Sequence, residues 1–229
     1  MNAQHLLWIG IAAAVAFLAS FVFGDALHLP LDLYYLIYFA AIMGLFLVYV
    51  RKTGLDVPST FSRRLAWGIV LGLIVAALMV KNVLSRPETA HLTGPLLGWA
   101  LIWRGLIYGT VDGLLLSVFP WIVTWRAFDA ENRSLAGKIG VSVLAWLFIV
   151  LTTTAYHLGY SDFRSKKLVQ ANIGNTIMSL ATLLPANPAG TPIAHAALHI
   201  SAVLHSPETE LFLPPHRSGN DGLERPKDE

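Results

Sequence analysis

The sequence predicts an all-α fold, a polytopic membrane helix bundle with about seven transmembrane helices. Of the 229 residues, 55% are hydrophobic and 13% are charged, whereas about 25% of the residues of a soluble domain are charged. So few charges cannot cover the surface of a soluble enzyme, and a chain this hydrophobic is not disordered. Seven apolar segments approach the length of about 20 residues that a helix needs to cross a bilayer. None alternates like a strand of an outer-membrane barrel.

The apolar segments are separated by short polar connections, so no soluble domain is inserted between them. They are Leu6–Phe23, Leu31–Val50, Leu65–Val80, Gly94–Trp125, Ile139–Tyr156, Leu168–Leu184 and the short Thr191–Leu204. The fourth would extend about 48 Å as one helix, which exceeds the thickness of a bilayer. We therefore expect it to tilt strongly or to break near Arg104 and Gly105.

The chain divides into one transmembrane helical domain, residues 1–205, and a polar tail, residues 206–229, which is rich in proline and charge and is expected to be disordered. The loop Arg51–Arg64 has four basic residues and the turn Gly24–Pro30 has none. This bias predicts a cytoplasmic N-terminus in a prokaryotic plasma membrane, although the basic loop after Tyr160 opposes it. Because no basic residue precedes it, the first segment is expected to be a retained helix rather than a signal peptide.

Composition also excludes several kinds of site. The chain has no cysteine, so it has no disulfide, thiolate nucleophile, iron–sulfur cluster or cysteine-based zinc site. Its formal net charge of +2 does not indicate nucleic-acid binding. The expected partners are membrane lipid and, as an open alternative, other membrane subunits.

Ionisable residues inside the apolar segments are the main functional signal, because each costs about 2.5–3.5 kcal/mol in the bilayer centre. Arg104 and Asp112 lie two helical turns apart, with Tyr108 between them on the same expected face. His157 closes the fifth segment. We expect Arg104, Asp112, His157 and His195 to converge on one polar cavity as the catalytic residues. The simpler interpretation is that they form ion pairs and packing contacts.

The last segment carries His195 and His199 at a spacing of four residues, which places both imidazoles on one helical face. This is the spacing with which a helix chelates zinc, here without the glutamate of a His-Glu-x-x-His motif. Zinc is therefore the candidate cofactor, with His157, His195 and His199 as candidate ligands. The alternative is that both histidines only pack against other helices.

The order of motifs in the C-terminal half resembles the CAAX-protease and bacteriocin-processing (CPBP) family of intramembrane proteases. That family has a Glu-Glu-x-x-x-Arg motif followed by glycine, then an aromatic-x-x-x-His motif, then His-x-x-x-Asn or Asp. Arg104 and the following glycine match the first motif, His157 matches the histidine of the second, and His195 opens the third. The resemblance implies a hydrolase-like protein with a peptide or lipid-linked substrate in an intramembrane cavity.

Four positions depart from the family pattern. Trp99 and Ala100 stand where the two glutamates would be, Thr153 replaces the aromatic residue, and His199 replaces the final Asn or Asp. Because the glutamate that activates water in the family is missing, the resemblance implies a degenerate relative, or altered chemistry that uses Asp112.

Two other functions compete. A zinc-dependent membrane hydrolase, similar to the alkaline ceramidase and adiponectin-receptor type, would hold the metal with the three histidines and orient its water with Asp112. A structural or assembly subunit of a larger membrane complex is favoured by two glycine ladders, at positions 68 and 72 and at 105, 109 and 113. Haem ligation by paired histidines is a further alternative.

Overall fold

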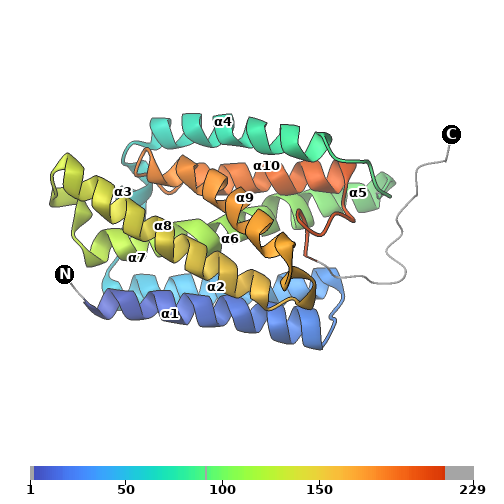
Figure 1. Cartoon of the computed structure of the whole chain (residues 1–229), viewed down its shortest axis with the longest axis horizontal. Coiled ribbons are helices and arrows are strands. Elements are labelled where there is room, and N and C mark those ends of the chain that lie inside the picture. Colours follow the sequence, from blue (N-terminus) through green and yellow to red (C-terminus); the bar gives the residue numbers. More distant parts are fainter. Residues whose placement is uncertain (1–2, 91, 215–229) are drawn as a thin grey trace.

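The computed structural model describes residues 3–90 and 92–214. All regular secondary structure in these two ranges is helical, which confirms the all-α prediction. The helices run along a common long axis and pack side by side as a bundle, with α4 and α1 at opposite edges of the view in Figure 1.

The first three rods are α1 (Ala3–Leu18), which continues as the π-helical η1 (Ala19–Ala26), then α2 (Leu31–Thr53) and, after the short α3 (Val57–Ser62), α4 (Leu65–Leu84). The fourth rod consists of α5 (Gly94–Ala100), η2 (Leu101–Ile107), α6 (Tyr108–Gly113), η3 (Leu114–Val118) and α7 (Phe119–Ala127). The last three are α8 (Leu135–Leu158), α9 (Lys166–Leu183) and α10 (Gly190–His205), and the 3₁₀ turns η4 (Ala130–Asn132) and η5 (Ser161–Phe163) precede α8 and α9.

Local sequence explains where several helices begin and end. The Asp56 carboxylate accepts a hydrogen bond from the Ser59 amide at the start of α3, and Ser134 accepts one from the Gly137 amide at the start of α8. Both are N-caps of the preferred residue type. Gly54 ends α2 with a φ of 61°, in the left-handed region that glycine adopts without strain.

Five helices are long and apolar enough to cross a membrane, by length and composition. They are Gln4–Ala26, Leu31–Thr53, Leu65–Leu84, Gly94–Ala127 and Leu135–Leu158. The prediction of seven spans is therefore supported for five. The 16 residues of α10 extend only about 24 Å, and α9 carries lysines and amides along its first half.

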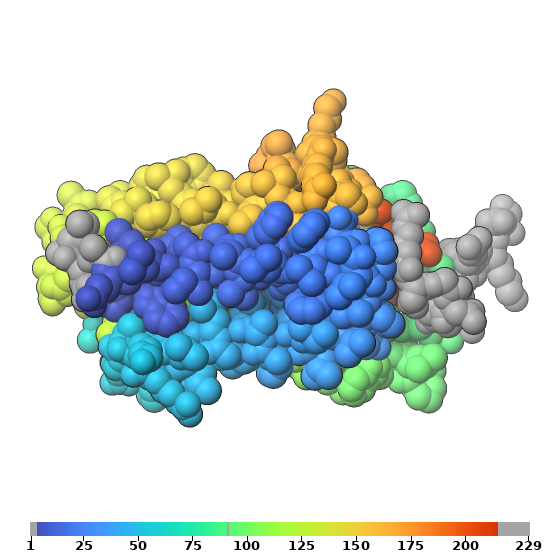
Figure 2. Space-filling model, turned by 90° about the horizontal axis from the view of Figure 1, so that it is seen from below, coloured from blue at the N-terminus to red at the C-terminus, as the bar shows by residue number. Residues whose placement is uncertain are grey.

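The outward faces of the long helices are strongly apolar. Leu7 is 69% exposed, Trp67 66% and Leu135 76%. A surface this apolar is unfavourable in water and suits a hydrocarbon environment. Figure 2 shows one such face, formed by α1 and α2 with α8 beside α1.

The fourth rod neither breaks near Arg104 nor leaves the bundle, contrary to one of the two alternatives predicted. It runs continuously through two π-helical segments, one containing Arg104 and one starting just after Asp112. It is also the most buried of the long helices, with 78% of its apolar window inside the bundle. Wide turns of this kind occur often at functional sites.

The C-terminal tail does not begin at Ser206. Residues 206–214 fold back on the bundle in a series of turns, with Ser206, Phe212 and Leu213 buried. The prediction of a disordered tail covers residues 206–229. Residues 206–214 are packed on the bundle, and residues 215–229 lie outside the described residues.

Candidate metal centre

Glycines bring the fourth rod into direct contact with α10. A Cβ added to Gly109 would lie 2.8 Å from the Ala196 Cα, and one added to Gly113 would lie 3.0 Å from the Pro192 Cα. Side chains larger than hydrogen would therefore push the two helices apart. Because Asp112 directly precedes Gly113, this close approach sets its carboxylate in front of the histidines on α10.

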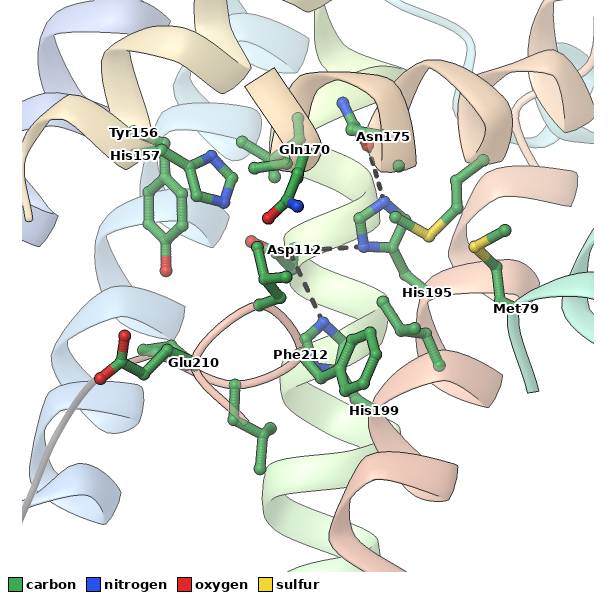
Figure 3. A pocket seen from close by; sticks show the side chains of 18 of the residues that line it. Met79, Asp112, Tyr156, His157, Gln170, Asn175, His195, His199, Glu210 and Phe212 are labelled. Atoms are coloured by element: carbon green, nitrogen blue, oxygen red, sulfur yellow. Dashed lines mark hydrogen bonds and ion pairs between the residues drawn. The ribbon is translucent and has the colours of Figure 1, made fainter. Parts of the chain in front are cut away.

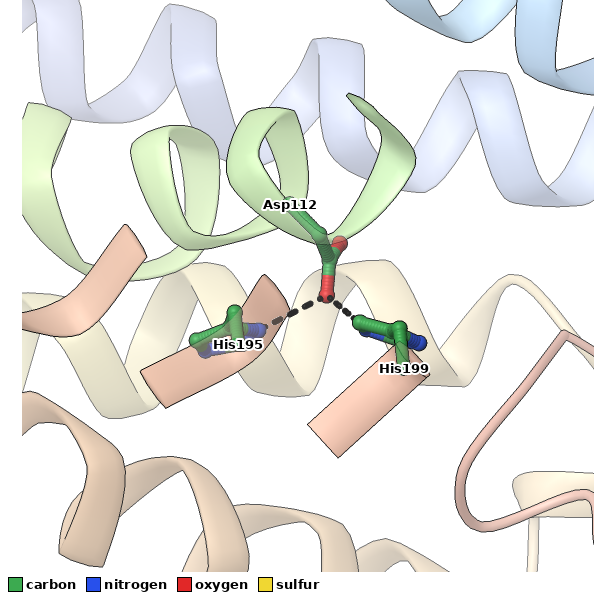
Figure 4. Close-up of side chains that lie close together, drawn as sticks. All are labelled: Asp112, His195 and His199. Atoms are coloured by element: carbon green, nitrogen blue, oxygen red, sulfur yellow. Dashed lines mark ion pairs between the residues drawn. The ribbon is translucent and has the colours of Figure 1, made fainter. Parts of the chain in front are cut away.

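The cluster consists of Asp112, His195 and His199. Asp112 Oδ2 lies 3.3 Å from His195 Nδ1 and 3.7 Å from His199 Nε2. Dashed lines mark both contacts in Figure 4. The three side chains are buried, and one ligand atom from each lies within 4.8 Å of the others. Two imidazoles and one carboxylate are a donor set typical of catalytic zinc.

The outer atoms of two of these side chains are already hydrogen-bonded. The Tyr38 hydroxyl donates to Asp112 Oδ1 at 2.8 Å. His195 Nε2 lies 2.9 Å from Asn175 Oδ1, and because an amide oxygen only accepts, Nε2 carries the proton. This leaves the Nδ1 lone pair of a neutral His195 facing Asp112 Oδ2.

Asn175 is itself fixed by two neighbours. Its Nδ2 donates to Thr153 Oγ1 at 2.6 Å, and its Oδ1 accepts from Ser117 Oγ at 3.2 Å. The amide oxygen therefore points to His195. Histidine ligands of metals usually donate their second nitrogen to such an acceptor.

Three buried nitrogens at the cluster have no hydrogen-bond partner in the part of the chain that the structure describes. They are His195 Nδ1 and both ring nitrogens of His199. A buried polar atom without a partner is costly, and a nitrogen lone pair opposite a carboxylate oxygen adds repulsion. A cation or a proton between these atoms would remove both costs.

A cavity of about 130 Å³ lies beside the cluster. Its wall includes Asp112, His195 and His199 and, on the other side, His157, Gln170 and the C-terminal segment (Figure 3). The volume accommodates a few water molecules. Water in this cavity could thus contact an ion held by the cluster.

His157 lines the same cavity from α8 but is not one of the three clustered ligands. Its Nδ1 lies 2.8 Å from the Thr153 carbonyl oxygen and must donate to it, so the Nε2 of a neutral ring is free to accept. The candidate ligand set of His157, His195 and His199 is therefore replaced by one in which Asp112 takes the place of His157. The helical spacing could not show this, because His157 and His195 lie on different helices.

Arg104 does not line the cavity, contrary to expectation. Its Nε and Nη2 donate to the two carboxylate oxygens of Asp32 at 2.8 and 3.1 Å. Arg104 lies in the π-helical η2, whose hydrogen bonds span five residues, so a spacing of four no longer keeps residues on one face. The simpler interpretation of Arg104, an ion pair with another helix, is the one found.

Apart from Tyr108, the buried group of tyrosines beside Asp112 was not predicted. The Tyr156 hydroxyl lies 2.7 Å from that of Tyr108, 3.1 Å from that of Tyr34 and 3.4 Å from that of Tyr160. The signal in the sequence was the pair Tyr34 and Tyr38 on one face of the second segment.

Comparisons with models of protein families, with curated proteins and with solved structures found no match for this chain. The resemblance to the CPBP family stays a prediction based on its short motifs. The function must therefore be argued from the geometry of the site.

Proposed function

We propose that this chain is an integral membrane protein with a zinc site formed by Asp112 Oδ2, His195 Nδ1 and His199 Nε2, and that this site is the centre of a membrane hydrolase. One observation carries the proposal. Three buried ligand atoms converge, while the other oxygen of Asp112 and the other nitrogen of His195 are already bonded to Tyr38 and Asn175. This is the arrangement of ligands and supporting residues found at metal sites.

Three protein ligands leave the fourth position of a tetrahedral zinc ion to water, as in catalytic rather than structural sites. A bound zinc ion would supply a water with a pKa of about 7. The residues of the chain then have separate tasks. Tyr38 and Asn175 orient two ligands, and His157, across the cavity with Nε2 free to accept, is placed to exchange a proton with water.

The proposal is compatible with a divergent relative of the CPBP family. The carboxylate that the family supplies from its glutamates would come from Asp112 in the same continuous helical rod, more than three turns beyond Trp99 and Ala100. His157 and His195 line the same cavity. The substrate would be a peptide or a lipid-linked molecule that reaches the cavity through the membrane.

The alternative of a structural or assembly subunit has less support, because its main signal has another explanation. Gly105, Gly109 and Gly113 contact α10. Gly68 lies against Asn187 and Gly72 against Gly190. Both ladders are thus used within the chain rather than left for a partner.

For the orientation we propose a cytoplasmic N-terminus in a prokaryotic plasma membrane, with lipid as the surrounding partner. The ends of α2 and α7 and the start of α4 lie at the same end of the bundle as the start of α1 (Figure 1), and the basic residues there include Arg51, Arg64 and Arg126, which favours this orientation under the positive-inside rule. The chain has no cysteine, so single cysteines introduced at Ser59 and Glu88 report the two sides. An impermeant thiol reagent added to intact cells should label Glu88→Cys and spare Ser59→Cys, and the reverse result would invert the orientation.

The zinc site is tested by metal analysis of the protein purified in detergent. We expect about one zinc per chain, lost in Asp112→Ala, His195→Ala and His199→Ala. His157→Ala and His205→Ala, which alter histidines outside the cluster, should keep the metal, and Asn175→Leu should weaken its binding by about 10–100-fold. Absence of metal from the purified protein after zinc loading, or full zinc in His195→Ala, would contradict the proposal.

A further inference from the structure

The segment that follows α10 lies at the end of the bundle away from the start of α1 (Figure 1), and part of it lines the cavity. Its start is held by the connection between α4 and α5. The Thr89 amide donates to the His205 carbonyl oxygen at 3.1 Å, and the Glu208 amide donates to Thr89 Oγ1 at 3.2 Å. His205 Nε2 also donates to the Arg86 carbonyl oxygen at 2.8 Å.

The second half of this segment forms part of the cavity wall. Residues 210–214 all line the cavity that contains Asp112, His195 and His199 (Figure 3). Phe212 and Leu213 are 5% and 4% exposed and pack in an apolar cluster with residues of α4, α9 and α10. Five consecutive residues thus cover one side of the cavity that contains the candidate zinc site.

One ion pair joins this wall to the bundle. Lys167 Nζ contacts Glu210 Oε2, at the first turn of α9. The Glu210 side chain is 15% exposed and that of Lys167 is 40% exposed, so the pair is accessible enough to open and buried enough to favour closure.

The cavity volume of about 130 Å³ is below the roughly 300–1,000 Å³ of pockets that hold small organic ligands. A peptide or lipid-linked substrate cannot enter this space while residues 210–214 form its wall. Turns held by a few contacts are among the parts of a protein that open at low cost.

We propose that residues 206–214 are a strap that closes the site and must leave for substrate to enter, and that the Lys167–Glu210 pair and Phe212 hold it shut. The strap is autoinhibitory, because the closed form keeps the site from anything larger than a few waters. The identity of the substrate rests on the proposed function. The closing and opening of the strap depend only on the contacts of Lys167, Glu210 and Phe212.

Thiol labelling tests the strap in the full-length chain. Gly174 lines the cavity, and a Cβ added there meets nothing within 4 Å, so Gly174→Cys provides a unique thiol in a chain without cysteine. In detergent, a charged maleimide should label this thiol slowly. Phe212→Ala, Lys167→Glu and Glu210→Lys should each accelerate labelling by about tenfold or more, because each removes a contact that holds the closed form.

Two controls make the result specific. The double variant Lys167→Glu with Glu210→Lys restores an ion pair and should return labelling to the slow rate, whereas a merely misfolded protein would not recover. Glu208→Gln, which changes an exposed strap residue, should leave the rate unchanged. Equal labelling rates in all variants, or no recovery in the double variant, would overturn the strap.

Zinc content separates this proposal from the preceding one. The strap variants should keep the metal, because none of the altered residues is a proposed ligand. Absence of zinc together with accelerated labelling would contradict the zinc site and support the strap.

Discussion

Asp112 shows at the scale of one residue how the site is held, because its two oxygens have different partners. Oδ1 accepts from Tyr38, and Oδ2 faces the two histidines. The carboxylate can therefore not rotate without losing a buried hydrogen bond. By holding Oδ1, Tyr38 also fixes the position of Oδ2, the oxygen that faces the histidines.

The Tyr38 hydroxyl can be tested against a neighbour on the same helix. Tyr38→Phe should lower the free energy of unfolding by about 2 kcal/mol, since a hydrogen bond to a charged group is lost. It should also weaken zinc binding. Tyr35 is equally buried, but its hydroxyl has no partner in the described residues, so Tyr35→Phe should be neutral or slightly stabilising. Unfolding in detergent, followed by tryptophan fluorescence, measures both, and equal losses would contradict the assignment.

The candidate residues were predictable to different degrees. Asp112, His195 and His199 stand out in the sequence because ionisable groups are costly in apolar segments. Tyr38 does not, since tyrosine is common in membrane helices and carries no charge. Asp32, the partner of Arg104, was missed because it lies in the first turn of its helix, where a carboxylate is usually explained by the helix dipole.

At the scale of the elements, the contact of η2 and α6 with α10 depends on the absence of side chains at Gly105, Gly109 and Gly113. The same sequence pattern was open to two interpretations, packing within the chain or packing between subunits. The distances decide for the first, because added Cβ atoms would collide with the backbone of α10 at Gly109 and Gly113.

Gly109→Ala tests this contact. The new methyl group would lie 2.8 Å from the Ala196 Cα, so we expect destabilisation by about 1–3 kcal/mol and weaker zinc binding as the helices move apart. Gly44→Ala is the matched control, because a Cβ there meets nothing within 4 Å and alanine favours a helix by up to about 1 kcal/mol. Thermal unfolding and zinc titration of both variants give the answer. A Gly109→Ala protein with unchanged zinc affinity would separate the glycine ladder from the site.

At the scale of the whole molecule, Glu131 joins helices that are distant in the sequence. Its carboxylate accepts from Arg64 at 2.6 Å, at the start of α4, and from the Trp125 indole at 3.2 Å, near the end of α7. Arg63 lies 3.4 Å away. Partial burial alone would raise the pKa of Glu131, but the indole hydrogen bond and the nearby positive charges outweigh it and hold the pKa below its usual value.

A depressed pKa in the folded chain means that Glu131 stabilises the fold above the pKa it has when unfolded. That contribution is lost as the pH falls below about 4.5, the ordinary value for glutamate, towards the folded value. Glu131→Gln should therefore lower the melting temperature at pH 7 by at most a few degrees. The difference from the unaltered chain should shrink as the pH falls from 5 to 3. A difference that stays constant over this range would show that Glu131 acts through packing rather than charge.

The sequence by itself determined the class of fold and the three residues of the candidate site, Asp112, His195 and His199. Long apolar segments must become helices that satisfy their own backbone hydrogen bonds in a membrane, and charges or histidines within them need partners. Only the tertiary structure decided which of these residues meet. That depends on wide π-helical turns, which rotate Arg104 towards Asp32, and on glycines that let α10 approach until Asp112 faces His195 and His199. It also decided that residues 206–214 pack on the cavity, because a short apolar stretch within a polar tail gains burial only when a matching surface is assembled by other helices.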